Sequence, residues 1–197
     1  MSAIKLIPTS GGGSVSLSPP NSTSGADVTV TMPTTSRGLG KILQVVQSVK
    51  TDTASTNSPA ETAFVDTGLS VAITPTSSSH KILVFWNINI SSSGENVTML
   101  KLQRGSTDIL LGDASSTRVR STQAQAGAYS GAPWKSDVAA GQYLDSPATT
   151  SATTYKFVWC SNGTATSYIN RSSRDHTTSN DEDTRFTSSI TVMEVAA

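Results

Sequence analysis

The chain has 197 residues, a formal net charge of zero from 14 basic and 14 acidic residues, and a Ser plus Thr content of about a third. This length suits one main domain with a shorter segment beside it. Without a basic excess we expect no nucleic-acid partner, the one cysteine excludes an intrachain disulfide, and no apolar run reaches the roughly 18–20 residues needed for membrane insertion.

The apolar residues favour an ordered all-β protein over a disordered one. Disordered chains hold few aromatic and β-branched apolar residues, whereas Trp86, Phe157 and Trp159 lie inside apolar runs here. Apolar residues recur in these runs at every second position, which indicates strands rather than helices. Many short strands separated by turn signals are typical of an antiparallel two-sheet β-sandwich, of the jelly-roll type.

Residues 1–38 form an extended N-terminal arm. The apolar residues of segments 4–7, 15–17 and 28–32 are separated by breaks rich in Gly, Pro and Ser. Such an arm buries too little surface to fold alone, so we expect it to complete a sheet in another chain, for attachment and oligomerisation. The residues expected to dock are Ile4, Leu6, Ile7, Val15, Leu17, Val28 and Val30.

Residues 39–197 form the predicted β-sandwich domain. The expected strands are 41–49, 62–66, 69–73, 80–90, 96–104, 108–111, 142–147, 153–161, 164–170 and 185–195. The strands between 80 and 111 are expected to follow one another as an antiparallel meander. Asn162-Gly163 predicts a hairpin that joins the strands on either side of it. Residues 51–61 and 112–140 are expected to be polar loops.

The clearest alternation lies in residues 80–90. The positions expected to face the core are Ile82, Val84, Trp86, Ile88 and Ile90. The opposite face begins with the apolar Leu83 and Phe85 and ends with asparagines, as in a strand that passes from a covered region to an open one. Residues 153–161 alternate in the same way, and we expect Cys160 to be a small apolar residue of that strand.

Three aromatic residues lie in or beside the long polar loop: Tyr129, Trp134 and Tyr143. Aromatic side chains with polar neighbours bind sugars, and they also anchor protein interfaces. For Trp134, which follows Pro133, we favour a packing anchor over a glycan contact. Both interpretations stay open at this point.

Residues 171–184 are expected to form a charged loop. Its ionisable residues are Arg171, Arg174, Asp175, His176, Asp181, Glu182 and Asp183. We expect Arg171, Arg174, Asp175, Asp181, Glu182 and Asp183 to form salt bridges in solvent or between subunits. The alternative is a Ca²⁺ site built from the carboxylates, although their spacing does not match an EF-hand.

No constellation predicts catalysis or a cofactor, so we expect a protein that is not an enzyme. The glycines at 11–13 lack the Gly-Lys-Ser/Thr that follows a phosphate-binding loop. His80 and His176 have no nucleophile at a recognisable spacing. The carboxylates that could supply a glycosidase pair are expected at the surface: Asp113, Asp137 and Asp145.

Several blocks resemble structural proteins of tailed bacteriophages, particularly fibre-type and related virion appendage proteins of marine and cyanobacterial phages. The blocks are residues 40–47, 64–75, 79–84, 102–107 and 188–195, together with the arm. The resemblance carries no catalytic residue. It implies a homo-oligomer, commonly a trimer, in which the arm serves attachment or locking between subunits. The chain is short for a complete long fibre, which favours a role as a compact spike, a fibre head or a capsid-decorating protein.

The expected function is therefore that of a non-enzymatic virion structural protein, a homotrimeric tail fibre or spike component anchored by its arm. The alternatives are a capsid decoration or head-fibre protein, and a module that binds host-surface glycan; a depolymerase is a third. The expected partners are further copies of the chain, other tail or capsid proteins, and host cell-surface glycan. The expected location is the virion, assembled in the host cytoplasm, with no cofactor and no metal.

Overall fold

The computed structural model describes residues 41–57, 63–94, 97–126, 134–162, 165–176 and 183–197, and the backbone of two short strands near the N-terminus. The chain divides into two compact units, Met1–Ser36 and Arg37–Ala197. The second unit is called the body below, and the first is called the arm. Each is described separately.

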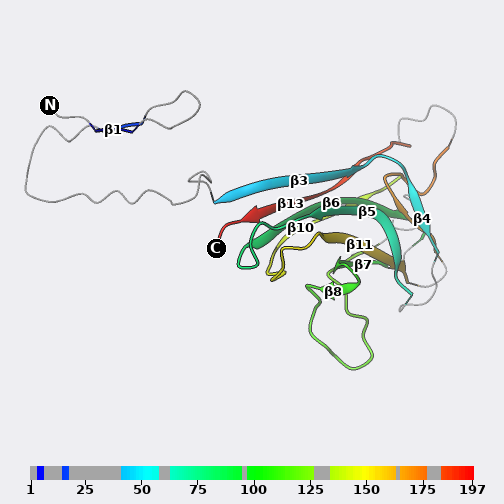
Figure 1. Ribbon diagram of the computed structural model, residues 1–197. Helices are drawn as coiled ribbons and strands as arrows, with labels where there is room; N and C mark the ends of the chain where they lie inside the picture. The colour runs from blue at the N-terminus through cyan, green and yellow to red at the C-terminus, as the bar shows by residue number, and fades with distance from the viewer. Residues whose placement is uncertain are drawn as a thin grey trace, which may run out of the picture. The chain divides into compact units, whose positions relative to one another are not determined.

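The body is all-β and consists of two antiparallel sheets (Figure 1). The first sheet has the order β3-β13-β6-β12-β4, and β10 pairs with the other edge of β6. Its strands are β3 (Ile42–Lys50), β4 (Ala54–Thr56), β6 (Lys81–Ser92), β10 (Asp137–Asp145), β12 (Ser167–Ile169) and β13 (Ser188–Val195). The second sheet has the order β5-β11-β7-β8, and β9 also pairs with β7. Its strands are β5 (Val65–Ile73), β7 (Val97–Arg104), β8 (Thr107–Ile109), β9 (Gln123–Ala126) and β11 (Thr153–Ser161).

The path of the chain is that of a jelly roll. After β3 the chain crosses to β5, returns to β6 and crosses again to β7. Strands β8 and β9 follow in the second sheet, and β10, β11 and β13 then alternate between the sheets. Two sheets linked by such crossings form the jelly-roll arrangement. The predicted antiparallel β-sandwich is therefore confirmed.

Two predicted connections are wrong, because both cross between the sheets. The strands at 81–92 and 97–104 do not belong to one meander, since β6 and β7 lie in different sheets and only β7 and β8 form a hairpin. The Asn162-Gly163 signal does not join a hairpin either, because β12 pairs with β4 and β6 rather than with β11. A turn signal reports that the chain reverses and does not report which sheet it enters.

The two short strands predicted at 62–66 and 69–73 are in fact one strand, β5. The register between β5 and β11 shifts at Phe157, where Lys156 pairs with Ser70 and Val158 with Asp66. Gly68 has a φ of 75° at this irregularity, a conformation that glycine adopts without a Cβ clash. Thr67-Gly68 is therefore a bulge within a strand rather than a turn.

Three predicted loop boundaries are also corrected. The stretch 51–61 contains β4, and the stretch 112–140 contains β9 and the beginning of β10. The short strand predicted at 142–147 is the second half of β10, which has nine residues. Its first half has weak apolar alternation because only Ala139 is buried there, so the pattern did not reveal it.

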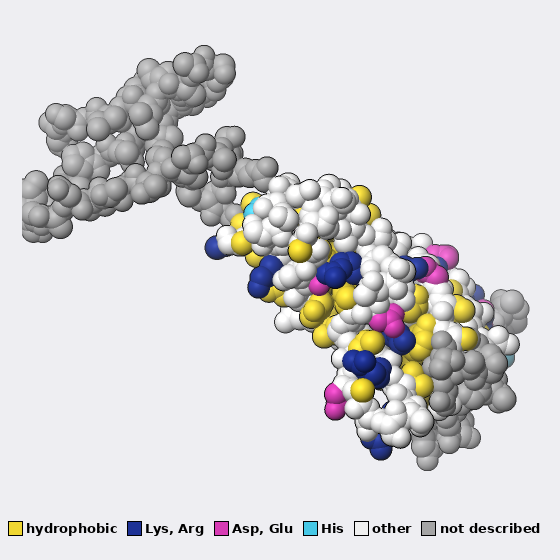
Figure 2. Space-filling view, turned by 60° about the horizontal axis from the view of Figure 1, so that its bottom comes forward, with side chains coloured by type: hydrophobic (Ala, Val, Ile, Leu, Met, Phe, Trp, Pro, Cys, Tyr) yellow, Lys and Arg dark blue, Asp and Glu magenta, His cyan; other side chains and the backbone are white. Residues whose placement is uncertain are grey.

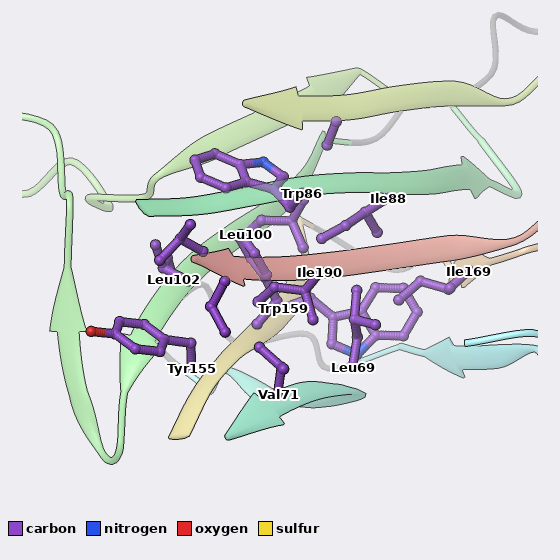
Figure 3. Packing of buried hydrophobic residues seen from close by; sticks show 14 of the residues in the cluster. Leu69, Val71, Trp86, Ile88, Leu100, Leu102, Tyr155, Trp159, Ile169 and Ile190 are labelled. Atoms are coloured by element: carbon purple, nitrogen blue, oxygen red, sulfur yellow. The ribbon is translucent and has the colours of Figure 1, made fainter. Parts of the chain in front are cut away.

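The core lies between the sheets, where the inward residues of β6 meet those of β11 (Figure 3). The five positions of residues 80–90 that were predicted to face the core are all buried, as are Tyr155, Phe157 and Trp159. The ring centroids of Trp86 and Phe157 lie 5.3 Å apart at an interplanar angle of 54°, a favourable tilted contact. The Cys160 side chain is fully buried, as predicted for a small apolar strand residue.

The arm contains β1 (Ile4–Leu6) and β2 (Val15–Leu17), which pair antiparallel with each other. In this register Ile4 is opposite Leu17 and Leu6 is opposite Val15. This pairing therefore occupies one backbone edge of β1 and one backbone edge of β2. The other predicted docking residues of the arm lie outside the described residues: Ile7, Val28 and Val30.

Candidate functional site

The described residues of the charged loop form salt bridges within the subunit. The Asp175 carboxylate bridges Arg171, at 2.8 Å, and Arg185. The backbones of Arg171 and Arg185 also form an isolated antiparallel bridge. The Arg171 guanidinium lies 4.3 Å from the ring centroid of Tyr168, which adds a cation–π contact. These contacts hold the chain after β12 against the chain that leads into β13.

Asp183 is the centre of a second cluster in the same loop. Its carboxylate accepts hydrogen bonds from the Arg174 Nε, the Ser172 hydroxyl and the His176 backbone N–H. Burial raises the pKa of Asp183, but the hydrogen bonds and the charge of Arg174 outweigh it, so the pKa lies below its usual value. Asp183 is thus an ionised anchor for the loop.

The predicted salt-bridge residues are therefore brought together in part. Arg171, Arg174, Asp175 and Asp183 form the ion pairs described above, and Asp181 and Glu182 lie outside the described residues. Within the described ranges, no group of three or more His, Cys, Asp or Glu side chains could hold a metal ion. A role of this loop between subunits stays a prediction.

The two predicted aromatic residues that the structure describes, Trp134 and Tyr143, have different surroundings. Trp134 is exposed, and the Arg174 guanidinium lies 5.5 Å from its ring centroid. Tyr143 is half-buried and packs against the core. Tyr143 lies six residues after Asp137, the first residue of β10, and the rise of a strand makes this separation roughly 20 Å. Tyr129 lies outside the described residues.

A shallow pocket of about 410 Å³ lies where β10 meets the stretch around β8 and β9. The indole N–H of Trp86 donates to the Gln123 side-chain oxygen at 2.7 Å, and the Gln123 amide donates to the Ala140 carbonyl at 2.8 Å. A Cβ on Gly141 would clash with the Trp86 ring, so the indole packs directly against the backbone of this glycine. The sequence gives no spacing signal that could have revealed this arrangement.

A buried carboxylate on the last strand is a feature that sequence reasoning missed. Glu194 is fully buried, and its Oε1 accepts hydrogen bonds from the N–H and the hydroxyl of Thr76, both at 2.6 Å. His80 Nδ1 lies 2.7 Å from the same oxygen, and the Gln44 amide donates to Oε2 at 2.6 Å. Burial raises the pKa of Glu194, but the hydrogen bonds from Thr76, His80 and Gln44 outweigh this effect and bring the pKa down to about 2. The signal was present, because Glu194 occupies the inward position after Ile190 and Val192.

A second buried carboxylate corrects the expectation that Asp145 lies at the surface. Asp145 is buried, and Arg104 Nη1 donates to its two oxygens at 2.8 and 2.9 Å. The Tyr155 hydroxyl donates to the same carboxylate at 2.6 Å. Burial and the adjacent carboxylate raise the pKa of Tyr155, which therefore stays protonated. Because Arg104 and the tyrosine satisfy the carboxylate, its burial is compatible with a structural role.

The outer face of the first sheet carries an apolar row, which is called the outer row below. By the strand register, Val45 is opposite Met193, Met193 is opposite Leu83, and Leu83 is opposite Leu144. The row therefore crosses the sheet from β3 to β10, and both of its end residues are exposed. Leu83 was predicted to lie on a face that is covered where β6 begins, yet the described residues leave it only half-buried.

Charged side chains are sparse on the visible surface. Figure 2 shows one face of the body, on which backbone and uncharged polar side chains predominate and hydrophobic side chains gather in patches between scattered Lys, Arg, Asp and Glu residues. This agrees with a composition in which charged residues make up 14% of the chain. A surface of this kind favours contacts that depend on shape and on apolar burial rather than on charge.

Comparisons with known proteins identify no relative: no family model matches the chain, and no curated protein matches it. Within the part of the chain that the structure describes, no helix is long and apolar enough to cross a membrane.

Proposed function

We propose that the protein is a non-enzymatic structural component of a phage virion, a homo-oligomer of the fibre or spike type that its N-terminal arm anchors. The observation that carries the proposal is the division of the chain into a body and an arm. The body has its own core. The described strands of the arm have three residues each, and a two-stranded ribbon of this size is marginal in water without a further partner.

The assignment to a virion draws on the sequence resemblance to tailed-phage proteins and on the class of fold. Jelly rolls form viral capsid and lectin domains among others. The fold alone does not imply this function, so the likeness of fold supports the proposal by analogy only. The buried carboxylates also support the proposal, since the hydrogen bonds that Glu194 and Asp145 accept connect loops and strands of the body.

The molar mass of the full-length chain in solution tests the oligomer. Light scattering coupled to size exclusion should give a multiple of the 20.5 kDa chain, and a trimer is the expected multiple. A monomer that persists at high protein concentration would contradict the proposal. Gold-labelled antibody against the body should then decorate intact particles, and label on the head rather than the tail would favour the capsid-decorating alternative.

Glycan binding is the second candidate, and the exposed indole of Trp134 favours it. Arg174 covers part of the ring, which leaves the remainder available for stacking on a sugar. A glycan array probed with the wild-type protein and with Trp134→Ala tests this candidate. Signal that is lost in the variant would support it, and an array without signal would exclude a glycan among those displayed.

A further inference from the structure

From Gln44 to Val49 the free edge of β3 lacks the features that usually protect the edge of a sheet. Among the described residues β3 pairs only with β13, and Figure 1 shows it at the border of the body. Its nine residues span about 30 Å. Unpaired edges are commonly protected by proline, by charge, by a bulge or by shortness. Residues 42–49 contain neither proline nor a charged side chain.

The other edges of the two sheets show such protection. Side chains cover part of the edge of β10, because Gln125 donates to the Val138 carbonyl and Gln123 donates to the Ala140 carbonyl. β5 is interrupted by the bulge at Gly68. β8 and β9 have three and four residues. The edge of β3 is thus the long one that the described residues leave open, and the one register shift of β3 against β13 lies at its start, between Ile42 and Gln44.

The side chains at this edge are mostly apolar on the outer face, where Gln47 is the polar exception and donates to the Thr191 hydroxyl. Val45 and Val49 are 55% and 53% exposed, and Ile42 at the start of the strand is 45% exposed. Val45 is also the end of the outer row, which continues through Met193 and Leu83. An added strand with apolar residues at every second position would extend this row, because directly opposite residues of paired strands lie on the same face.

The arm contains a segment that fits this edge. Residues 28–32 read Val-Thr-Val-Thr-Met, so that Val28, Val30 and Met32 fall on one face of a strand, and Pro33 follows. The segment is uncharged, as is the edge of β3 from 42 to 49. The other two apolar runs of the arm already pair with each other as β1 and β2.

We propose that residues 28–32 of one copy add a strand to the free edge of β3 in a second copy, with Val28, Val30 and Met32 on the side of Val45 and Val49. The backbone N–H and C=O groups of the two strands then pair, as in other cases of β-strand addition. This inference rests on the proposed homo-oligomer and names the surface that holds it. When each copy donates its segment to the β3 edge of the next copy, the copies can close into a ring. Such a ring uses one long unpaired edge per copy.

Disulfide trapping tests the contact in the full-length chain. Val30→Cys is combined in turn with Val45→Cys, Gln47→Cys and Val49→Cys, which are exposed positions on the outer face of β3. At least one combination should give covalent oligomers on a non-reducing gel after mild oxidation. The matched control is Val30→Cys with Val138→Cys, since Val138 is 48% exposed on the same sheet face at the opposite strand, β10. Val30→Cys alone controls for the buried Cys160.

The outcomes separate this inference from the proposed function. Covalent oligomers from β3 positions alone support it, and a disulfide within one chain shows that the arm docks on its own body and overturns the exchange between copies. Absence of any β3 disulfide, in a protein whose mass is that of an oligomer, overturns the contact but leaves the oligomer. A monomeric wild-type protein overturns both.

Edge charge gives a second test that does not depend on thiols. Val45→Lys combined with Val49→Lys places two cations at an edge that an uncharged strand is proposed to cover. Because both side chains are exposed, thermal unfolding of the body should change little. The dissociation constant of the oligomer should rise at least about tenfold, and Val138→Lys should leave it unchanged. An equal effect of the two changes would contradict the proposal.

Discussion

Replacing the buried Glu194 by glutamine should destabilise the body in a pH-dependent way. The carboxylate accepts four hydrogen bonds while fully buried, and its pKa falls from an ordinary 4.5 to about 2. That fall corresponds to about 3 kcal/mol of folding free energy. Glu194→Gln keeps the shape of the side chain, but it removes the charge and turns one acceptor into a donor that faces other donors. We therefore expect the free energy of unfolding at pH 7 to drop by about 3 kcal/mol.

The sign of the pH dependence follows from the lowered pKa. A carboxyl group whose pKa is lower in the folded than in the unfolded state stabilises the fold above the unfolded value and loses this effect as the pH falls. The contribution of Glu194 should therefore be complete above about pH 5 and disappear progressively between pH 4.5 and about 2. The wild-type protein loses this stability on acidification, and the glutamine variant has none of it to lose.

Urea unfolding followed by tryptophan fluorescence measures the effect at a fixed chain concentration. The difference between wild type and Glu194→Gln should stay constant from pH 7 to about pH 5 and shrink from pH 4.5 toward pH 3. Asp113→Asn is the matched control, because Asp113 is exposed in the loop after β8 and should leave the curve unchanged. Parallel curves for wild type and Glu194→Gln across this range, or equal stability at pH 7, would refute the reasoning.

Three further substitutions test the packing and the buried polar contacts. Gly141→Ala should cost about 1–3 kcal/mol in the free energy of unfolding, because its Cβ would meet the ring of Trp86 at 2.4 Å, whereas Gly112→Ala, whose Cβ meets nothing closer than 3.9 Å, should stay within about 0.5 kcal/mol. Tyr155→Phe should lower the thermal midpoint by the equivalent of about 1–2 kcal/mol, since it removes a hydroxyl that donates to a buried carboxylate. Asn170→Ala should cost about 2–4 kcal/mol in the free energy of unfolding, because it removes three side-chain hydrogen bonds and places alanine at a φ of 62°. Asn170→Gly removes the same hydrogen bonds without the backbone strain, so its loss should be smaller. Equal losses in the two variants would contradict this.

The sequence predicted the strands whose two faces differ clearly. β6 and β11 were located to within two residues because large apolar side chains alternate along them, and alternation reports burial directly. β10 was half missed because its inward positions include Ala139 and Gly141, whose small side chains give no apolar signal. Gly141 is small because Trp86 occupies the space that a Cβ would need.

Sheet membership and polar burial could not be predicted from local patterns. The segment after β6 carries Ser and Gly and the segment after β11 begins with the hairpin signal Asn162-Gly163, yet only the complete fold decides that the chain crosses to the other sheet there. Asp145 was expected at the surface because carboxylates are rarely buried without partners, and its partner Arg104 lies 41 residues away in the sequence. Contacts at such separations leave no periodic trace in one sequence.

The buried polar contacts bear on the edge of β3, because they fix both ends of that strand. At its start, the Gln44 amide donates to the buried Glu194 and to the Thr74 carbonyl. At its end, the buried Asn170 donates to the Lys50 carbonyl. A strand that is held at both ends loses little further conformational freedom when another strand pairs with it, which lowers the entropic cost of association. These contacts therefore pre-organise β3 for the proposed strand addition, and the substitution of Glu194 should weaken that addition as well as folding.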